Sequence, residues 1–246
     1  MRTSYKYSLW QRVKDRLSAP FHSASTNYVK YLRSQGVKVG QGVVFRDAKS
    51  VTIDLTRPSL IEIGDNVDIN VNFTIMTHDF ASSVFLNHFK ELVNSSGAVK
   101  LGNNIYIGRD VTILKGVTVG DNCVIGLGSI VTSDIPSGSV AVGSPAKVIC
   151  SIEEYFLRRK ARCRKEAFEY ARSIRDKFGR QPEIGDFWEE FPLFVSGDEV
   201  DNPAYSALPI RRQLGVAYEH YKLTHKAPYG SFEEFLQAAF AEDKEW

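Results

Sequence analysis

The sequence has few of the features that mark exported, metal-binding or membrane-spanning proteins. Its 246 residues include only 3 cysteines, and their number and spacing fit neither a disulfide framework nor a zinc site. No run approaches the roughly 18 consecutive apolar residues that cross a bilayer. The first residues also lack the apolar core of a signal peptide. We therefore expect a reduced, cytoplasmic protein.

The sequence also lacks an excess of charge of one sign. Lys and Arg total 31 and Asp and Glu total 29, which leaves a net charge of +2. This balance gives no overall attraction to nucleic acid, so no nucleic-acid partner is expected. Near the start, Leu9, Trp10, Val13 and Leu17 recur at helical spacing among basic residues, as in a membrane-surface helix. A short helix packed on its own protein explains the same pattern and is the commoner case.

A six-residue period runs through the middle of the chain. Aliphatic residues occupy six consecutive positions of this period, namely Leu101, Ile107, Ile113, Val119, Ile125 and Val131. Four residues after each of them stands a further small or aliphatic residue, from Ile105 to Ile135. Upstream the register fails at Arg57, and it predicts further inward positions at Val39, Phe45, Val51, Ile63, Ile69 and Ile75.

The period is interrupted once by sequence that does not repeat. From Ile75 to Leu101 there are 26 residues, which is not a multiple of six. An insertion, roughly Phe80 to Val99, must therefore project from the repeat. A period of six fits neither a helix nor a simple strand, but it suits a solenoid of short strands with glycine-assisted corners. Arg57 and Pro58, where the register fails, are expected to form an outward bulge.

These hexads resemble those of the hexapeptide-repeat acyltransferases, in particular the sugar O-acetyltransferase branch. The resemblance covers about residues 37–149 and implies a mainly β fold, a left-handed parallel β-helix of about five coils with a projecting loop at about 80–99. Residues 1–36 would then form an N-terminal helical segment. Residues 150–246 would form an α-helical C-terminal extension.

One histidine stands where this family places its chemistry. His78 occupies the fourth, outward place of the hexad that begins at Ile75, just before the insertion, and it follows the sequence IleGlyAspAsn (63–66) by twelve residues. The resemblance implies an acetyl-CoA-dependent O-acetyltransferase in which His78 is the general base. The backbone N–H of Arg109 would hold the oxyanion. Asp79 would orient the imidazole, contact the sugar, or serve only as a solvated loop residue.

The same resemblance implies a coenzyme site further along the chain. In the segment AsnAsnIleTyrIleGly (103–108), Tyr106 would lie along the pantetheine arm beside Gly108, although it could equally be an ordinary outward aromatic residue. The segments 124–136 and 141–149 are similar to the family's closing coils, and they add Leu127, Thr132, Ser133 and Lys147 to the coenzyme-binding set. Leu127 and Ser133 replace an alanine and a frequent lysine of the family. No metal site is implied.

The family forms homotrimers with active sites between neighbouring β-helices, and the resemblance implies the same here. The acceptor would be a sugar or glycan of bacterial capsule or lipopolysaccharide biosynthesis. Two other functions stay open, N-acetylation of an amino sugar or nucleotide sugar and a non-catalytic scaffold subunit. A γ-type carbonic anhydrase would need three histidine ligands, and the repeat region contains only His78 and His88.

Helical signals replace the repeat after residue 150. Ser151 and Glu154 form a capping box before an apolar stripe that includes Tyr155 and Phe156 and ends at Gly179. Two more helices are expected over 213–224 and 232–241. Six basic residues lie between Arg158 and Lys165. They would meet coenzyme phosphates or an anionic glycan, or form a solvated helix face. The aromatic residues of this part would make a small core of their own or dock on the β-helix.

Overall fold

The first of two compact units is a three-sided prism, and each of its faces is a sheet of mainly parallel strands. The computed structural model describes residues 24–241, and the boundary between the units lies between Tyr155 and Phe156. Face A contains β1 (Lys38–Val39), β4 (Ile61–Ile63), β7 (Val99–Leu101) and β10 (Thr118–Val119). Face B contains β2 (Val44–Phe45), β5 (Val67–Ile69), β8 (Ile105–Ile107), β11 (Val124–Ile125), β13 (Ser139–Gly143) and β14 (Ala146–Ser151). Face C contains β3 (Thr52–Ile53), β6 (Thr74–Ile75), β9 (Thr112–Ile113) and β12 (Ile130–Val131).

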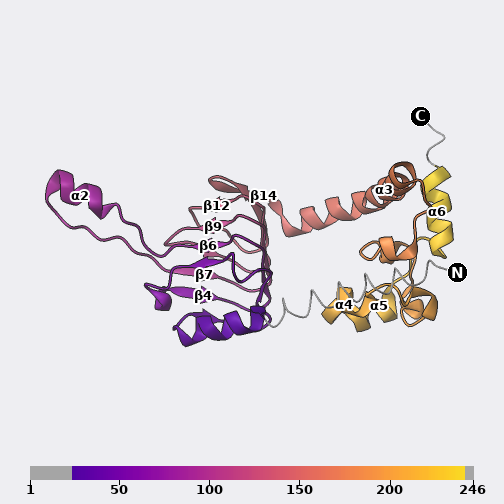
Figure 1. Cartoon of the computed structure of the whole chain (residues 1–246), viewed down its shortest axis with the longest axis horizontal. Helices are drawn as coiled ribbons and strands as arrows, with labels where there is room; N and C mark the ends of the chain where they lie inside the picture. The colour runs from indigo at the N-terminus through magenta and orange to yellow at the C-terminus, as the bar shows by residue number, and fades with distance from the viewer. Residues whose placement is uncertain (1–23, 242–246) are drawn as a thin grey trace. The chain divides into compact units, whose positions relative to one another are not determined.

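Consecutive strands visit faces A, B and C in turn, so the chain winds into stacked coils (Figure 1). β1 to β12 make four complete coils, and β13 with β14 closes a partial fifth. All pairs are parallel except β13 with β14, which is antiparallel. This is the solenoid that the six-residue period predicts.

The inward positions of the unbroken hexads fill the prism as predicted. All six aliphatic residues from Leu101 to Val131 belong to one buried core cluster. Cys123 lies in the same core, where burial raises the pKa of its thiol. The described cysteines form no disulfide.

The first coil departs from the predicted register. Val51 is only partly buried, and Ile53 in β3 takes the inward place instead. Because Phe45 pairs with Ile69 while Ile53 pairs with Ile75, extra residues stand on both sides of β3. One group of them forms the short 3-10 helix η1 (Pro58–Leu60), which buries no residue and confirms the outward bulge.

The corners between faces A and B depend on asparagine as well as glycine. Asn66, Asn104 and Asn122 adopt left-handed backbone conformations with φ of 54°, 54° and 56°, a region that asparagine enters more readily than most residues. They stack from coil to coil, and Asn104 Nδ2 donates to Asn122 Oδ1 at 2.7 Å. The neighbouring glycine column allows the coils to approach, because a Cβ on Gly64 would lie 2.4 Å from the carbonyl oxygen of Gly102.

The expected insertion leaves the prism after β6 and returns at β7. It carries α2 (Ser82–Phe89), which Figure 1 shows at the far end of the projecting loop and which the sequence did not predict. Val99, which we assigned to the insertion, is instead fully buried in β7. The mouth of the loop is closed where the N–H of Gly97 donates to the carbonyl of Thr77 at 2.9 Å.

A helix over residues 24–34 covers the first coil, as predicted for this segment. Val29 and Leu32 join the buried core of the prism. Ser25 Oγ accepts a hydrogen bond from the N–H of Phe45 at 2.9 Å. The amphipathic segment around Trp10 lies outside the described residues.

The second unit begins within the long helix α3 (Ile152–Phe178). The predicted capping box is present, because Ser151 Oγ accepts from the N–H of Glu154 and the Glu154 carboxylate accepts from the N–H of Ser151, both at 3.1 Å. The helix ends before Gly179, which has a φ of 60°. The apolar stripe is buried only in its second half, at Ala167, Phe168, Ala171 and Ile174. Tyr155 and Phe156 are exposed, contrary to the predicted stripe.

The remaining elements form their own aromatic core. They are η2 (Ile184–Asp186), η3 (Phe191–Leu193), η4 (Gly197–Glu199), η5 (Pro203–Tyr205), α4 (Ile210–Leu214), η6 (Gly215–Ala217), α5 (Tyr218–Thr224) and α6 (Phe232–Ala241). Phe187, Phe194 and Phe235 are fully buried, and the ring centroids of Phe187 and Phe194 lie 5.3 and 5.4 Å from that of Phe235. The helix expected over 213–224 is interrupted at Gly215, where φ is 48°. No helix in the described part of the chain is long and apolar enough to cross a membrane.

The close approach of coils at Gly64 gives a test of the stacking. Gly64→Ala places a methyl group against the backbone of the next coil, so we expect it to lower the free energy of unfolding by about 2–3 kcal/mol. Gly128→Ala is the control, because a Cβ there meets nothing within 4 Å although φ is 68°; we expect it to cost about 1 kcal/mol. Melting temperatures measured by calorimetry check the order, and equal losses would contradict the close-approach argument.

Candidate active site

His78 is held by a carboxylate that the sequence did not single out. His78 Nδ1 lies 2.5 Å from Asp54 Oδ2, and the two side chains are only 9 % and 4 % exposed. The stacking of β6 on β3 creates this contact, because Asp54 directly follows β3 in the coil below His78. His78 therefore stands on the outer surface of the coil, as predicted, but its ring is largely buried there.

Asp54 is a buried carboxylate with every oxygen engaged. Oδ2 accepts hydrogen bonds from the N–H and the hydroxyl of Thr77 at 3.0 and 2.5 Å. Oδ1 accepts from the hydroxyl of Thr56 at 2.6 Å. Burial by itself raises the pKa of Asp54, but the hydrogen bonds from Thr56, Thr77 and His78 outweigh it and hold the pKa well below the ordinary value. The carboxylate is therefore ionised at neutral pH.

This arrangement determines which nitrogen of His78 can act as a base. An ionised carboxylate at Nδ1 accepts its proton in a hydrogen bond, which leaves the lone pair on Nε2. Among the described residues, Nε2 has no hydrogen-bond partner. The ring of Phe80 contacts the imidazole edge to face, with centroids 5.0 Å apart. The contact with Asp54 thus orients the ring so that Nε2 is the nitrogen that can accept a proton from a substrate.

Asp79 does not orient the imidazole within this chain. Its Oδ1 accepts from the N–H of Ala81 at 2.9 Å, and its Oδ2 pairs with Lys115 Nζ. Lys115 also donates to Ser95 Oγ on the returning side of the loop. The contact with the imidazole that was considered for Asp79 is made by Asp54. Asp79 and Ser95, at the two ends of the projecting loop, are instead both held by Lys115 of the next coil.

Some of the predicted residues gather along the edge between faces C and A. Residues that follow the strands of face C stack in register there, namely Asp54, Met76, Leu114 and Thr132. His78, Lys115 and Ser133 lie within two residues of these positions. We call this group of five residues the C–A column: Asp54, His78, Lys115, Thr132 and Ser133.

The other predicted residues gather on face B and its edge with face C. The carbonyl of Arg109 accepts from the N–H of Gly128 at 2.8 Å, and a Cβ on Gly108 would lie 2.6 Å from the backbone nitrogen of Leu127. Lys147 pairs with Val142, which packs over Gly126. We call this group the B–C column: Tyr106, Gly108, Arg109, Leu127 and Lys147.

The B–C column offers an open surface. Tyr106 is 42 % exposed and Leu127 is 76 % exposed. Asn70 Nδ2 donates to the hydroxyl of Tyr106 at 3.2 Å, which holds the ring against the face. The described residues provide no acceptor for the backbone N–H of Arg109. The free N–H of Arg109 and the exposed ring of Tyr106 therefore lie on one coil, Leu127 lies on the next, and Lys147 lies in the closing strand β14.

One chain does not bring the two columns together. They lie along opposite edges of face C, and extended backbone rises about 3.3 Å per residue, so they are more than about 10 Å apart. The predicted coenzyme residues are divided between them, with Thr132 and Ser133 in the C–A column. His78 and the N–H of Arg109 therefore do not face each other within the chain.

Two residues of the site escaped the sequence analysis. Asp54 lies 24 residues before His78, in the irregular first coil, where the extra residues hide its place in the stack. Lys115 occupies an ordinary outward place of its hexad. Asp54 stacks on Met76, 22 residues further along, whereas residues of a regular coil such as Ile113 and Val131 stack 18 residues apart, so the period gives no signal for Asp54. Within residues 24–241, no three His, Cys, Asp or Glu side chains gather as a metal site.

No model of a known protein family matches the chain. It is 45 % identical over 94 residues to galactoside O-acetyltransferase of Escherichia coli (strain K12), which is 38 % of this chain and 45 % of that protein. It is 35 % identical over 133 residues to the putative acetyltransferase YvoF of Bacillus subtilis (strain 168), which is 54 % of this chain and 69 % of that protein. The chain belongs to the hexapeptide-repeat acetyltransferase family.

The chain has the left-handed parallel β-helix fold that the resemblance implies. Among solved structures, it is similar to a galactoside acetyltransferase in complex with coenzyme A, at 36 % identity and a TM-score of 0.36. That match covers 50 % of this chain and 57 % of that one. In the sequence comparison, the matched part of the chain spans less than half the length of the galactoside O-acetyltransferase of E. coli.

The low pKa of Asp54 predicts a pH-dependent contribution to stability. The unfolded pKa is about 3.9, so the ionised carboxylate stabilises the fold fully above that value and less as the pH falls below it toward the folded pKa. We expect Asp54→Asn to lower the melting temperature strongly at pH 7 and somewhat less at pH 3, with the difference still shrinking at lower pH. Asp68→Asn, which removes a half-exposed carboxylate from face B, is the control. A melting-temperature difference for Asp54→Asn that stays constant with pH would contradict the assignment.

Proposed function

We propose that this chain is an acetyl-CoA-dependent O-acetyltransferase that acts on a sugar hydroxyl in the cytoplasm, in the synthesis of a bacterial capsule or lipopolysaccharide. The observation that carries the proposal is the pairing of His78 with the ionised carboxylate of Asp54, which leaves Nε2 as a base on the outer surface of the coil. The family supplies the class of reaction. The similarity to a galactoside O-acetyltransferase supports a sugar as the acceptor.

His78 and Asp54 account for the proton in this reaction. The thioester donor is already activated, so the chain has mainly to make the acceptor hydroxyl nucleophilic. Nε2 of His78 takes the hydroxyl proton as the sugar oxygen attacks the acetyl carbon. Asp54 stabilises the imidazolium that forms. The proton then passes from Nε2 to the departing sulfur, and both products leave neutral at the reacting atoms.

The backbone N–H of Arg109 stabilises the charge that develops on the acetyl oxygen. It has no acceptor among the described residues, and a preoriented donor of this kind is worth about 3–4 kcal/mol of barrier. The B–C column suits the arm of the coenzyme, because Tyr106 and Leu127 expose apolar surface beside backbone groups. Lys147 supplies a cation for a phosphate. Thr132 and Ser133, which lie in the C–A column, supply hydroxyl groups to the same coenzyme.

The active site is completed between copies of the chain. One chain carries the base in the C–A column and the oxyanion donor in the B–C column, and face C separates them. In a homotrimer, the C–A column of one β-helix faces the B–C column of its neighbour. The projecting loop also exposes the apolar side chains of Phe80, Phe89 and Leu92, which a neighbouring copy covers in this arrangement.

Removal of the base tests the proposed function. We expect His78→Ala to fold normally and to lower thiol release from acetyl-CoA by roughly 10²- to 10⁴-fold, the usual contribution of a general base. His88→Ala, on the projecting helix α2, is the matched control and should lose less than about half of the rate. A His78→Ala variant that kept more than half of the wild-type rate with a sugar acceptor would overturn the assignment.

The lysine at the end of the B–C column gives a second test. Lys147→Ala is expected to raise the apparent KM for acetyl-CoA by about 5- to 30-fold and to spare kcat, because a partly exposed phosphate contact acts in binding. Lys100→Ala, on face A, should leave both constants unchanged. Repeating the assay with dephospho-CoA thioester locates the contact. Equal losses with both donors would place it away from the 3′-phosphate.

A further inference from the structure

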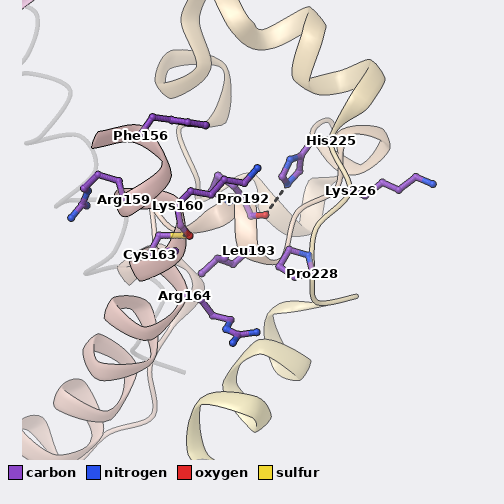
Figure 2. Close-up of a pocket in the computed structure, with 11 residues that line it drawn as sticks. Phe156, Arg159, Lys160, Cys163, Arg164, Pro192, Leu193, His225, Lys226 and Pro228 are labelled. Atoms are coloured by element: carbon purple, nitrogen blue, oxygen red, sulfur yellow. Dashed lines mark hydrogen bonds between the residues drawn. The ribbon is translucent and has the colours of Figure 1, made fainter. Parts of the chain in front are cut away.

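The second unit contains a pocket that the proposed reaction does not use. It has a volume of about 780 Å³ and lies between the first half of α3 and, opposite it, η3 with the loop around residue 225. Figure 2 shows Phe156, Lys160 and Arg164 on the α3 side and Pro192, His225 and Pro228 on the opposite side. Its size is within the range of sites for small ligands and short oligomers.

The charged side chains around this pocket are all basic. Arg159, Lys160, Arg164 and Lys226 line it, and no Asp or Glu does. Figure 2 shows Lys160 extending from α3 toward Pro192 and His225, whereas Arg159 and Lys226 extend outward on either side. Arg159 is paired with Glu166 at 3.2 Å, which reduces its own contribution. Lys160 and Arg164 are therefore the cations best placed to meet an anion in the pocket.

Apolar side chains form much of the pocket's lining, and the His225 ring beside them is held in place by two contacts. His225 Nε2 lies 2.8 Å from the carbonyl of Pro192. The His225 ring also stacks on Tyr221, with centroids 4.2 Å apart and planes at 18°. Phe156, Leu193 and Pro228 add apolar surface, and 60 % of Phe156 is exposed. Such flat apolar surfaces beside cations suit the C–H face of a ring that carries negative groups.

We propose that this pocket binds an anionic sugar chain, so that the acceptor of the acetyl group is an acidic glycan. This inference rests on the proposed function for the choice of a sugar. Lys160 and Arg164 line a concave site beside apolar side chains, whereas the whole chain carries a net charge of only +2. To bind a nucleic acid, the protein would instead need an extended face of basic side chains that follows the phosphate backbone of the nucleic acid.

Direct binding to the full chain tests the proposal without the reaction. The probes are fluorescently labelled hexasaccharides of three kinds: an oligogalacturonate with carboxylates, a phosphorylated malto-oligosaccharide, and neutral maltohexaose. We expect the chain to bind at least one anionic probe and the neutral probe at least about tenfold more weakly. Binding to only one anionic probe identifies the carboxylate or the phosphate as the recognised group. The proposal is overturned if all three probes bind equally or if none of them binds.

A matched pair of variants distinguishes the pocket from a general basic surface. Lys160→Gln with Arg164→Gln removes two charges that line the pocket, and Arg158→Gln with Arg162→Gln removes two charges from the same helix outside it. All four side chains are exposed, so both variants should keep the melting temperature. We expect the first pair to weaken anionic binding about tenfold or more and the second less than about twofold. Equal weakening by both pairs would assign binding to the helix charge alone and overturn the pocket.

Two further measurements separate this proposal from the proposed function. Thiol release with a small neutral acceptor should be unchanged by Lys160→Gln with Arg164→Gln, since neither residue belongs to the C–A or B–C column. If the chain bound the anionic probe through this pocket but released no thiol with any sugar, the proposed function would fail and the binding site would stand. Tighter binding of a short DNA duplex than of either anionic probe would overturn the site as a glycan site.

Discussion

The backbone hydrogen bonds between coils are the constraint on which the rest of the prism depends. Each coil donates to and accepts from the next through parallel ladders on three faces, and buried aliphatic residues fill the space between the faces. Because the ladders fix the register, residues in outward places form columns that run along the edges. The contact of His78 with Asp54 is a product of this stacking, since the two residues are distant in sequence and adjacent in coils.

The regular part of the fold could be predicted from the sequence, and the irregular part could not. The inward positions from Leu101 to Val131, the projecting segment and the outward place of His78 all follow from a six-residue period. The first coil breaks that period on both sides of Ile53, so the period wrongly predicts Val51 as inward and does not single out Asp54. Helix α2 was also missed, because the insertion shows no strong apolar period and α2 buries no residue.

The candidate site illustrates a second limit of sequence reasoning. Family resemblance selected residues of both columns as one site, yet the prism places them on opposite edges of face C. Successive hexads belong to successive faces, so the edge that a residue joins depends on a count of hexads. The insertion between His78 and Arg109 breaks that count, so spacing alone does not assign the two residues to edges. The asparagine corners are a related case, since the period draws attention to glycines while Asn104 and Asn122 form the stacked turn.

The mouth of the projecting loop has a consequence for how this fold can vary. The chain leaves after β6, the last strand of one coil, and re-enters at β7, the first strand of the next. The mouth is closed by Thr77 with Gly97 and by Lys115 with Asp79 and Ser95. The entropy of closing a loop grows only slowly with its length. Residues can therefore be gained, lost or exchanged beyond the mouth at little cost to the coils. The coils of the prism can therefore stay the same while the projecting loop, which begins next to His78, differs in length and sequence.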